Sequence, residues 1–277
     1  MTYLQALAVA ILQGATELFP VSSLGHAVVL PAVLHLGIDQ RSHEFLPFIV
    51  LLHTGTAVAL ISFFWRDWWA IFTGLFGLRS AHENSEARRV FLLIVIATIP
   101  AVIVGFALEK AIRGLFGTPV IAAVFLALNG IMLFFGERLR GRGHRALATL
   151  TPADALVIGC FQCGALIPGL SRSGATIVGG LLRGITHEAA AHFSFLIATP
   201  VIVGATVLEV PKLLHESVAP GTFSTAAVAA VVAGITAWIS TWFLMRYFRA
   251  NDQWALNPFA YYCIVFGLGS AAWLTWG

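Results

Sequence analysis

The sequence has very little charge. Asp, Glu, Lys and Arg make up only 10% of its 277 residues, whereas a soluble domain carries about 25%. So few charges cannot cover a water-facing surface, which excludes a soluble enzyme, a disordered chain and a coiled coil. Hydrophobic residues make up 58% of the chain. The composition therefore indicates an integral membrane protein.

Concentrated positive charge and cysteine are also scarce. The 16 Lys and Arg are spread along the chain and form no basic stripe, so nucleic acid is not an expected partner. Among three cysteines, Cys160 and Cys163 form a C-x-x-C in an apolar stretch without a second pair. We interpret both as small hydrophobic residues rather than a redox or metal site. No basic segment precedes the first apolar stretch, so no signal peptide is predicted.

Six stretches between charged residues are long enough to cross a bilayer, which takes about 20 apolar residues. They are residues 45–65, 90–108, 114–136, 189–208, 217–245 and 253–277. Trp65, Trp68 and Trp69 close the first stretch, and Trp273 and Trp276 close the last, as expected at membrane interfaces. The sequence thus predicts an all-α membrane protein with six spans, three in each half.

Two further apolar segments, 4–36 and 155–183, are interrupted by polar residues, Pro and Gly. The two limbs of the first, 4–13 and 27–36, each reach only about 15 Å, half of the hydrocarbon core. Irregular backbone at membrane depth is tolerated only inside protein or beside a watery cavity. Both segments are therefore predicted to be re-entrant helical hairpins. Their polar centres are residues 14–26 and 167–176.

The two hairpins match each other in sequence. At an offset of 148 or 149 the matched pairs are Gln13/Gln162, Leu18/Leu166, Pro20/Pro168 and Ser23/Ser171. We predict one membrane domain, 1–277, built of two repeats, 1–145 and 146–277. Each repeat has an odd number of spans, so the second repeat is inverted relative to the first. The hairpins then enter from opposite faces, and their tips meet near the midplane.

Basic residues predict the orientation. Outside the hairpins, ten arginines fall on the side reached after the first span and four Lys or Arg on the other. The arginine-rich side is therefore expected to be cytoplasmic. Both termini, the first hairpin and the opening of the site are then predicted on the outer side.

Each hairpin tip carries a charge, Glu17 in the first and Arg172 in the second. A charge at the bilayer centre costs about 2.5–3.5 kcal/mol unless it is paired or hydrated. The two could simply form a structural ion pair, but their polar neighbours indicate a site. These neighbours are Ser22, Ser23 and His26 in the first hairpin, and Ser171, Ser173 and Thr176 in the second.

The two tips suit different parts of phosphate chemistry. Arginine, serine hydroxyls and the start of a helix after Ser171 together bind an anion. On the other tip, Ser23, His26 and Glu17 supply a nucleophile and an acid/base pair. A carboxylate beside phosphates can instead hold a divalent cation.

Residues 13–26 (QGATELFPVSSLGH) and 168–176 (PGLSRSGAT) resemble the two signatures of the bacterial undecaprenyl-diphosphate phosphatases, the bacitracin-resistance family. Cys160-Phe-Gln-Cys163, Phe193-Ser-Phe195 and Gly204-Ala-Thr206 extend the likeness over nearly the whole chain. The resemblance implies hydrolysis of undecaprenyl diphosphate to the monophosphate, which recycles the lipid carrier for envelope polymers. It implies a bacterial plasma (inner) membrane location, a divalent cation (Mg²⁺ or Ca²⁺), a polyprenyl diphosphate lipid as substrate, membrane lipids as partners, and a homodimer as a candidate assembly.

Residue by residue, the resemblance assigns the site as follows. The catalytic residues are Ser23, His26, Glu17 and Arg172; the phosphate-binding residues are Ser22, Ser171, Ser173 and Thr176; the cation ligands are Glu17 and Gln13. The family often has Glu at position 13 and Thr at position 24, where this chain has Gln13 and Leu24. Glu17 is then the sole ionised side-chain ligand.

Two mechanisms remain open. In one, Ser23 attacks the terminal phosphorus and His26 moves the proton, while Arg172 clamps the diphosphate. In the other, His26 and Glu17 activate water directly. His53 and His192 lie within predicted spans. Each is expected to be neutral and bonded to a backbone carbonyl, with a place in the lining of the site as the alternative.

Two other functions compete with this prediction. A flippase or transporter of a phosphorylated isoprenoid would need the arginine clamp but not the nucleophile. A phosphatidic-acid-type phosphatase has a Ser-Gly-His that Ser23-Leu-Gly-His26 superficially resembles. The further Arg…His…Asp block of those enzymes is not found in this sequence.

Overall fold

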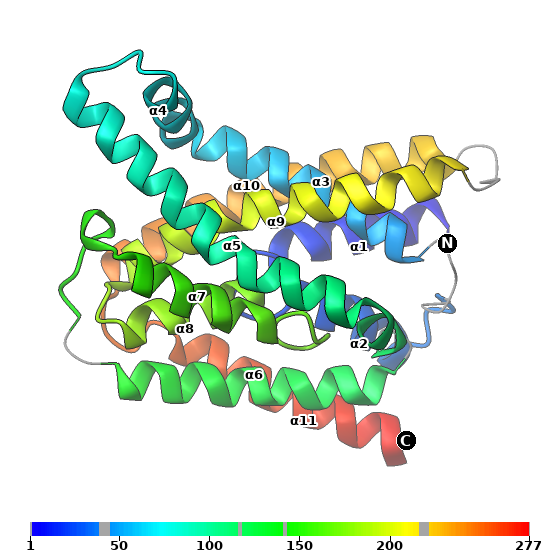
Figure 1. The fold of residues 1–277 in the computed structure, drawn as a ribbon. Helices are drawn as coiled ribbons and strands as arrows, with labels where there is room; N and C mark the ends of the chain where they lie inside the picture. Colours follow the sequence, from blue (N-terminus) through cyan, green and yellow to red (C-terminus); the bar gives the residue numbers. More distant parts are fainter. Residues whose placement is uncertain (1, 39–44, 116–117, 141–142, 216–221, 277) are drawn as a thin grey trace.

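The computed structural model describes residues 2–38, 45–115, 118–140, 143–215 and 222–276. Regular structure within these ranges is helical, apart from one isolated bridge between Arg145 and Ile185. The α-helices are α1 (Tyr3–Thr16), α2 (Ser23–Val33), α3 (Phe45–Phe63), α4 (Trp65–Leu75), α5 (Ala81–Leu115), α6 (Pro119–Leu139), α7 (Pro152–Gly164), α8 (Arg172–Leu182), α9 (His187–His215), α10 (Thr222–Ala250) and α11 (Asn257–Trp276) (Figure 1). The all-helical prediction is confirmed for this part of the chain.

Long apolar helices lie at the predicted spans. Five helices are long and apolar enough to cross a membrane by themselves, namely α5, α6, α9, α10 and α11. The bent pair α3 and α4 makes a sixth when it is counted as one span. Many large apolar side chains on these helices face outward, among them Val58, Phe106 and Val265, which are 62–72% exposed. The chain is therefore a multi-pass membrane protein.

The first span ends earlier than the tryptophan positions suggested. α3 stops at Phe63, and Trp65, Trp68 and Trp69 lie on the separate helix α4, which is bent by 76° from α3. α4 packs against α5, where Gly74 sits directly against the Cβ of Ala87. Conversely, α5 extends well beyond the predicted 90–108 at both ends. Charges mark where a helix leaves the membrane, but they do not end or bend the helix.

Both interrupted segments form helical hairpins, α1 with α2 and α7 with α8, which run inward from opposite ends of the bundle (Figure 1). Their caps agree at an offset of 149. Capping boxes at Thr2 and Thr151 start α1 and α7. Ser22 and Ser171 cap α2 and α8, and each accepts from a glycine N–H. The hairpins therefore share their local structure as well as their sequence.

Glycines bring the hairpins close to the surrounding helices. A Cβ at Gly14 of α1 would lie 2.3 Å from the carbonyl oxygen of Ala233 in α10. Gly169, in the turn between α7 and α8, has φ +104°, and a Cβ there would lie 2.3 Å from the carbonyl oxygen of Ala122 in α6. Small residues allow this backbone contact between membrane helices. The two hairpin tips are thereby held in the middle of the bundle.

Candidate functional site

The two hairpin tips are bonded to each other and to α6. Ser173 Oγ donates to the carbonyl oxygen of Phe19 at 3.1 Å. Asn129, on α6, donates to the carbonyl oxygen of Pro20 at 2.9 Å and accepts from the Ser171 N–H at 2.9 Å. Asn129 is fully buried. The relative position of the tips is therefore fixed by hydrogen bonds rather than by apolar packing alone.

Glu17 is the centre of the polar contacts between the tips. It caps the C-terminus of α1 and is 8% exposed. Oε1 accepts from Arg172 Nη2 at 2.9 Å. Oε2 accepts from Gln13 Nε2 at 2.8 Å and Ser23 Oγ at 2.6 Å, and pairs with His53 Nε2 at 3.2 Å. Four donors thus surround one carboxylate, and the two tip charges pair with each other.

A cavity of about 250 Å³ lies beside this carboxylate. Its polar lining comes from both tips, α3 and α7: Glu17, Ser22, Ser23, His53, Gln162, Ser171 and Arg172. Its apolar lining comes from α2, α3, α5, α9 and the end of the second hairpin: Leu24, Ile49, Val50, Ala101, Ala165, Leu166, Leu170, Val201, Ile202 and Ala205. The cavity is therefore polar at the tips and apolar toward the spans, which suits an amphiphilic ligand with an anionic group.

Helix starts add to the attraction for an anion. α2 begins at Ser23 and α8 begins at Arg172, so both N-termini open at the cavity. The N-terminal end of a helix carries partial positive charge and free N–H groups. Two such ends and a guanidinium therefore converge on the same small space.

Some of the predicted residues line the cavity and others support it. Glu17, Ser22, Ser23, Ser171 and Arg172 line it, whereas Gln13, His26, Ser173 and Thr176 do not. The hydroxyl of Thr176 donates to the Arg172 carbonyl oxygen at 2.8 Å and contacts Ser194 Oγ at 2.7 Å. The hydroxyl of Ser173 is bonded to the first hairpin. These two groups hold the start of α8; their phosphate-binding role stays a prediction.

His26 is turned away from the cavity and is 1% exposed. Its Nδ1 lies 2.7 Å from the Ser22 carbonyl oxygen, and its Nε2 lies 2.8 Å from the Tyr262 hydroxyl. The ring is stacked on Tyr262 and Phe266 of α11. Ser22 has φ +66°, a conformation that non-glycine residues rarely adopt. The observed contacts of His26 therefore support this strained turn, and its role in proton transfer stays a prediction.

His53 lines the site, which the sequence prediction gave only as the alternative to a histidine bonded to the backbone. Its Nδ1 contacts the Ile49 carbonyl oxygen at 2.7 Å, as expected for a histidine in a span. Its Nε2, however, faces Glu17 and the cavity. One signal could have found it: an ionisable residue inside a span is a functional candidate by default, and His53 is followed by Thr54 and Thr56 in an otherwise apolar helix.

Comparison with known proteins decides the family. The sequence matches the family described as "Bacitracin resistance protein BacA" over residues 6–269. The chain belongs to this family. It is 64% identical to a protein of Granulibacter bethesdensis named undecaprenyl-diphosphatase, over 99% of this chain and 97% of that protein. It is 58% identical to the undecaprenyl-diphosphatase of Acidiphilium cryptum over the full length of both. The resemblance seen in the two hairpin motifs is thus confirmed.

The predicted cation ligands of this BacA-family chain do not fit a protein-held metal ion. Both oxygens of Glu17 are taken up by donors. Gln13 turns its amide nitrogen to Glu17, and its unpartnered Oε1 is not part of the cavity lining. The described residues contain no group of three His, Cys, Asp or Glu able to hold a metal. Mg²⁺ keeps several waters and is usually held by one or two carboxylates together with substrate phosphates, so these residues alone form no metal site and the divalent cation stays a prediction.

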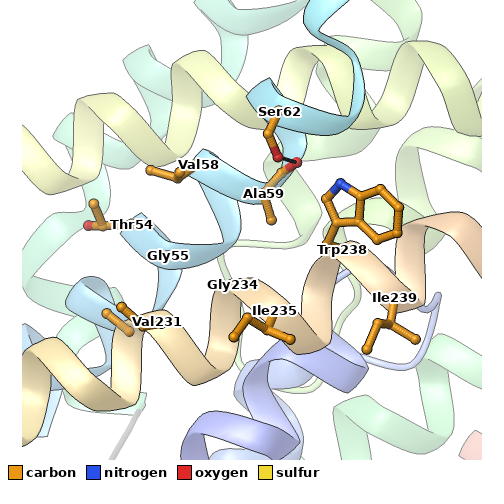
Figure 2. A pocket seen from close by; sticks show the side chains of 11 residues that line it. Thr54, Gly55, Val58, Ala59, Ser62, Val231, Gly234, Ile235, Trp238 and Ile239 are labelled. Carbon is orange, nitrogen blue, oxygen red and sulfur yellow. Dashed lines mark hydrogen bonds between the residues drawn. The ribbon is translucent and has the colours of Figure 1, made fainter.

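A second cavity, of about 570 Å³, lies between α3 and α10 (Figure 2). It shares no residue with the cavity at the tips, and it is lined by apolar and small side chains with no charge. A Cβ at Gly55 would lie 1.9 Å from the Ala230 carbonyl oxygen, so the two helices cross in backbone contact. Val58 and Ile235 in its wall are strongly exposed. This groove faces the lipid and lacks the groups that bind phosphate.

Proposed function

We propose that this chain hydrolyses undecaprenyl diphosphate to undecaprenyl phosphate and phosphate, and so recycles the lipid carrier of cell-wall synthesis. One observation carries the proposal: Glu17 holds the Ser23 hydroxyl at 2.6 Å and Arg172 at 2.9 Å at the wall of one cavity. A nucleophile, its base and an anion clamp are thus assembled at a cavity whose remaining lining is apolar. The two similar proteins are named undecaprenyl-diphosphatase, which agrees with this proposal.

The contacts support Ser23 as nucleophile and Glu17 as its base. As Ser23 Oγ attacks the terminal phosphorus, its proton passes to Glu17 Oε2, which already accepts from it. The bond from phosphorus to the bridging oxygen breaks, and the lipid monophosphate leaves with that electron pair. Glu17 passes its proton to the departing lipid monophosphate. Water then attacks the phosphoserine, gives one proton to the serine oxygen and keeps the other on the released phosphate. Arg172 and the two helix N-termini stabilise the phosphate charge throughout.

The membrane arrangement is part of the same proposal. The shared offset of 149 in the caps and the opposite approach of the hairpins in Figure 1 support an inverted repeat, 1–145 and 146–277. The arginine distribution supports an arginine-rich cytoplasmic end in the plasma membrane, with the termini and the opening on the outer side. An impermeant thiol reagent added from outside should label a cysteine at position 23; labelling from the inside alone would contradict this orientation.

Phosphate release from the purified chain tests the activity. The substrates are farnesyl and undecaprenyl diphosphate, assayed in detergent with Mg²⁺, with Ca²⁺ and with a chelator. Arg172→Ala and Ser23→Ala should each lower kcat/KM by about 100-fold or more. Ser62→Ala, a span serine bonded to the Ala59 carbonyl oxygen at the other cavity, is the matched control. Full activity of Ser23→Ala would exclude the phosphoserine route and favour direct attack by water.

No phosphate release under any condition, from protein shown to be folded, would overturn the proposed function. A carrier that flips the phosphorylated lipid would then be tested in liposomes.

A further inference from the structure

The groove between α3 and α10 continues into a charged cavity. The groove is lined by residues within 54–62 of α3 and 230–239 of α10 (Figure 2). The next residues along both helices, including Phe63 and Trp242, line a cavity of about 540 Å³. Phe63 also contacts Trp238 in the groove wall, with ring centroids 5.5 Å apart. The groove and this charged cavity therefore follow one another along the same two helices.

The charged cavity carries both signs of charge, because its lining contains two carboxylates and two guanidinium groups. Arg249 donates to Glu188 at 2.8 Å, so these two charges compensate each other. Asp67 of α4 and Arg246 of α10 form no such pair. Within the described part of the chain, the Arg246 guanidinium has no hydrogen-bond or ion-pair partner, and the Asp67 carboxylate has only a long contact of 3.4 Å with His192 Nε2. Two opposite charges thus line one cavity with unused hydrogen-bonding capacity.

The two spaces lie at the depths of a lipid chain and its headgroup. Along α10, residues 230–239 span about 14 Å, close to the ~15 Å of hydrocarbon in one leaflet. The groove wall is strongly exposed at Val58 and Val231, each 62%. The charged cavity lies at the break between α3 and α4, close in sequence to Trp65 and Trp69, which are typical of a membrane interface. An apolar groove thus leads to a charged cavity at the level of the headgroups.

We propose that the groove and the charged cavity bind one zwitterionic aminophospholipid, such as phosphatidylethanolamine. An acyl chain lies in the groove. The phosphate pairs with Arg246, because a planar guanidinium matches phosphate oxygens, and the ammonium donates to Asp67. An ethanolamine ammonium has three N–H donors, like that of lysine. A choline headgroup has no such donor, and a glycerol headgroup brings no cation to the carboxylate.

Native mass spectrometry of the purified full-length chain in detergent tests this proposal. The chain is titrated with phosphatidylethanolamine, phosphatidylglycerol and phosphatidylcholine that carry identical acyl chains. Wild type should bind one phosphatidylethanolamine at least about tenfold more tightly than either other lipid, as expected for a charge-assisted hydrogen bond.

Two variants separate the roles of the two charges. Arg246→Gln removes the phosphate partner and should weaken the binding of phosphatidylethanolamine and phosphatidylglycerol alike, by about tenfold. Asp67→Asn removes the ammonium partner and should weaken phosphatidylethanolamine alone by a similar factor, so that the headgroup preference is lost. A misfolded variant would not show this selective loss.

Arg66→Gln is the matched control. Arg66 adjoins Asp67 on α4 and lies over the Trp65 ring, but it does not line the charged cavity. Its variant should bind phosphatidylethanolamine like wild type. Ile235→Trp tests the groove, because this side chain is 59% exposed in the groove wall and a larger one would occupy the place of the acyl chain. It should weaken all three lipids.

Equal binding of the three lipids by wild type would overturn the proposal, whatever the variants do. So would equal weakening of phosphatidylethanolamine and phosphatidylglycerol in Asp67→Asn, or equal losses in Arg66→Gln and Arg246→Gln. Unchanged lipid binding in Ile235→Trp would overturn the assignment of the chain to the groove. Each readout is lipid binding without phosphate release, so a failure of the proposed hydrolysis would leave this inference standing.

Discussion

The hydrogen bonds of Asn129 should be the main device that fixes the two hairpin tips. Asn129→Ala would leave the Pro20 carbonyl and the Ser171 N–H without their partner in a fully buried setting. An unsatisfied buried polar group costs about 1–3 kcal/mol, so the two together should lower the free energy of unfolding by about 2–6 kcal/mol. The same change frees the N-cap residue of α8 and should lower kcat by more than it raises KM.

Unfolding by SDS titration, followed by tryptophan fluorescence, measures the stability loss, and phosphate release measures kcat and KM. Asn251→Ala is the control, because Asn251 is exposed and its side chain donates to the Tyr247 carbonyl oxygen one turn earlier in α10. Its effect should stay within about 0.5 kcal/mol. A loss below about 1 kcal/mol in Asn129→Ala with normal kcat would refute the view that this side chain holds the tips.

Two further predictions follow from packing and charge. Gly14→Ala places a Cβ 2.3 Å from the Ala233 carbonyl oxygen and should lower the free energy of unfolding by about 1–3 kcal/mol in the same titration. In the control Gly204→Ala, the new Cβ has no described neighbouring atom within 4 Å, so the free energy of unfolding should not fall. Equal effects of the two changes would contradict the close contact of α1 and α10. In the loop before α11, burial acts to raise the pKa of Asp252. Hydrogen bonds from the side chain and backbone of His187 outweigh this effect, so the net pKa of Asp252 lies below its ordinary value. The folded-state pKa is depressed, so this stabilisation is present above about pH 4 and is lost as the pH falls further. Asp252→Asn should therefore be less stable than wild type at pH 6. The difference in unfolding free energy should be under about 1 kcal/mol, because the side chain is half exposed. This difference should shrink below pH 4, and a difference that stays constant with pH would contradict the lowered pKa of Asp252.

Much of the fold could be predicted because its signals are local. The length of an uncharged run predicts a span, and limbs too short to cross predict a hairpin. Ser171 predicted where α8 begins. The second limb of the first hairpin was predicted at 27–36, but α2 already begins at Ser23, because Ser22 caps it. The bend after Phe63 could not be predicted in this way, because the tryptophans at 65–69 fit either the end of a span or a helix lying along the interface. Tertiary contact with α5 decides between them.

The residues of the candidate site likewise divide into those with a local sequence signal and those placed by tertiary contacts. Glu17 and Arg172 were found because charges at hairpin tips stand out, and they do pair. His26 was expected to move the proton of Ser23 because both lie in the polar turn of the first hairpin. Its ring instead contacts Tyr262 of α11, which is 236 positions away in sequence. His53 was not assigned to the site for the converse reason: its position at Glu17 depends on the rotation of α3, which the local sequence does not set.

Within the proposed mechanism, the pairing of the tip charges gives the site an order of events. In the empty cavity, Arg172 pairs with Glu17, so the two tip charges compensate each other before any ligand arrives. A diphosphate offers Arg172 a more highly charged partner than one carboxylate. As the guanidinium turns to the phosphate oxygens, Glu17 keeps the Ser23 hydroxyl as a hydrogen-bond donor and is free to take its proton. In this mechanism, substrate binding frees the base that activates Ser23.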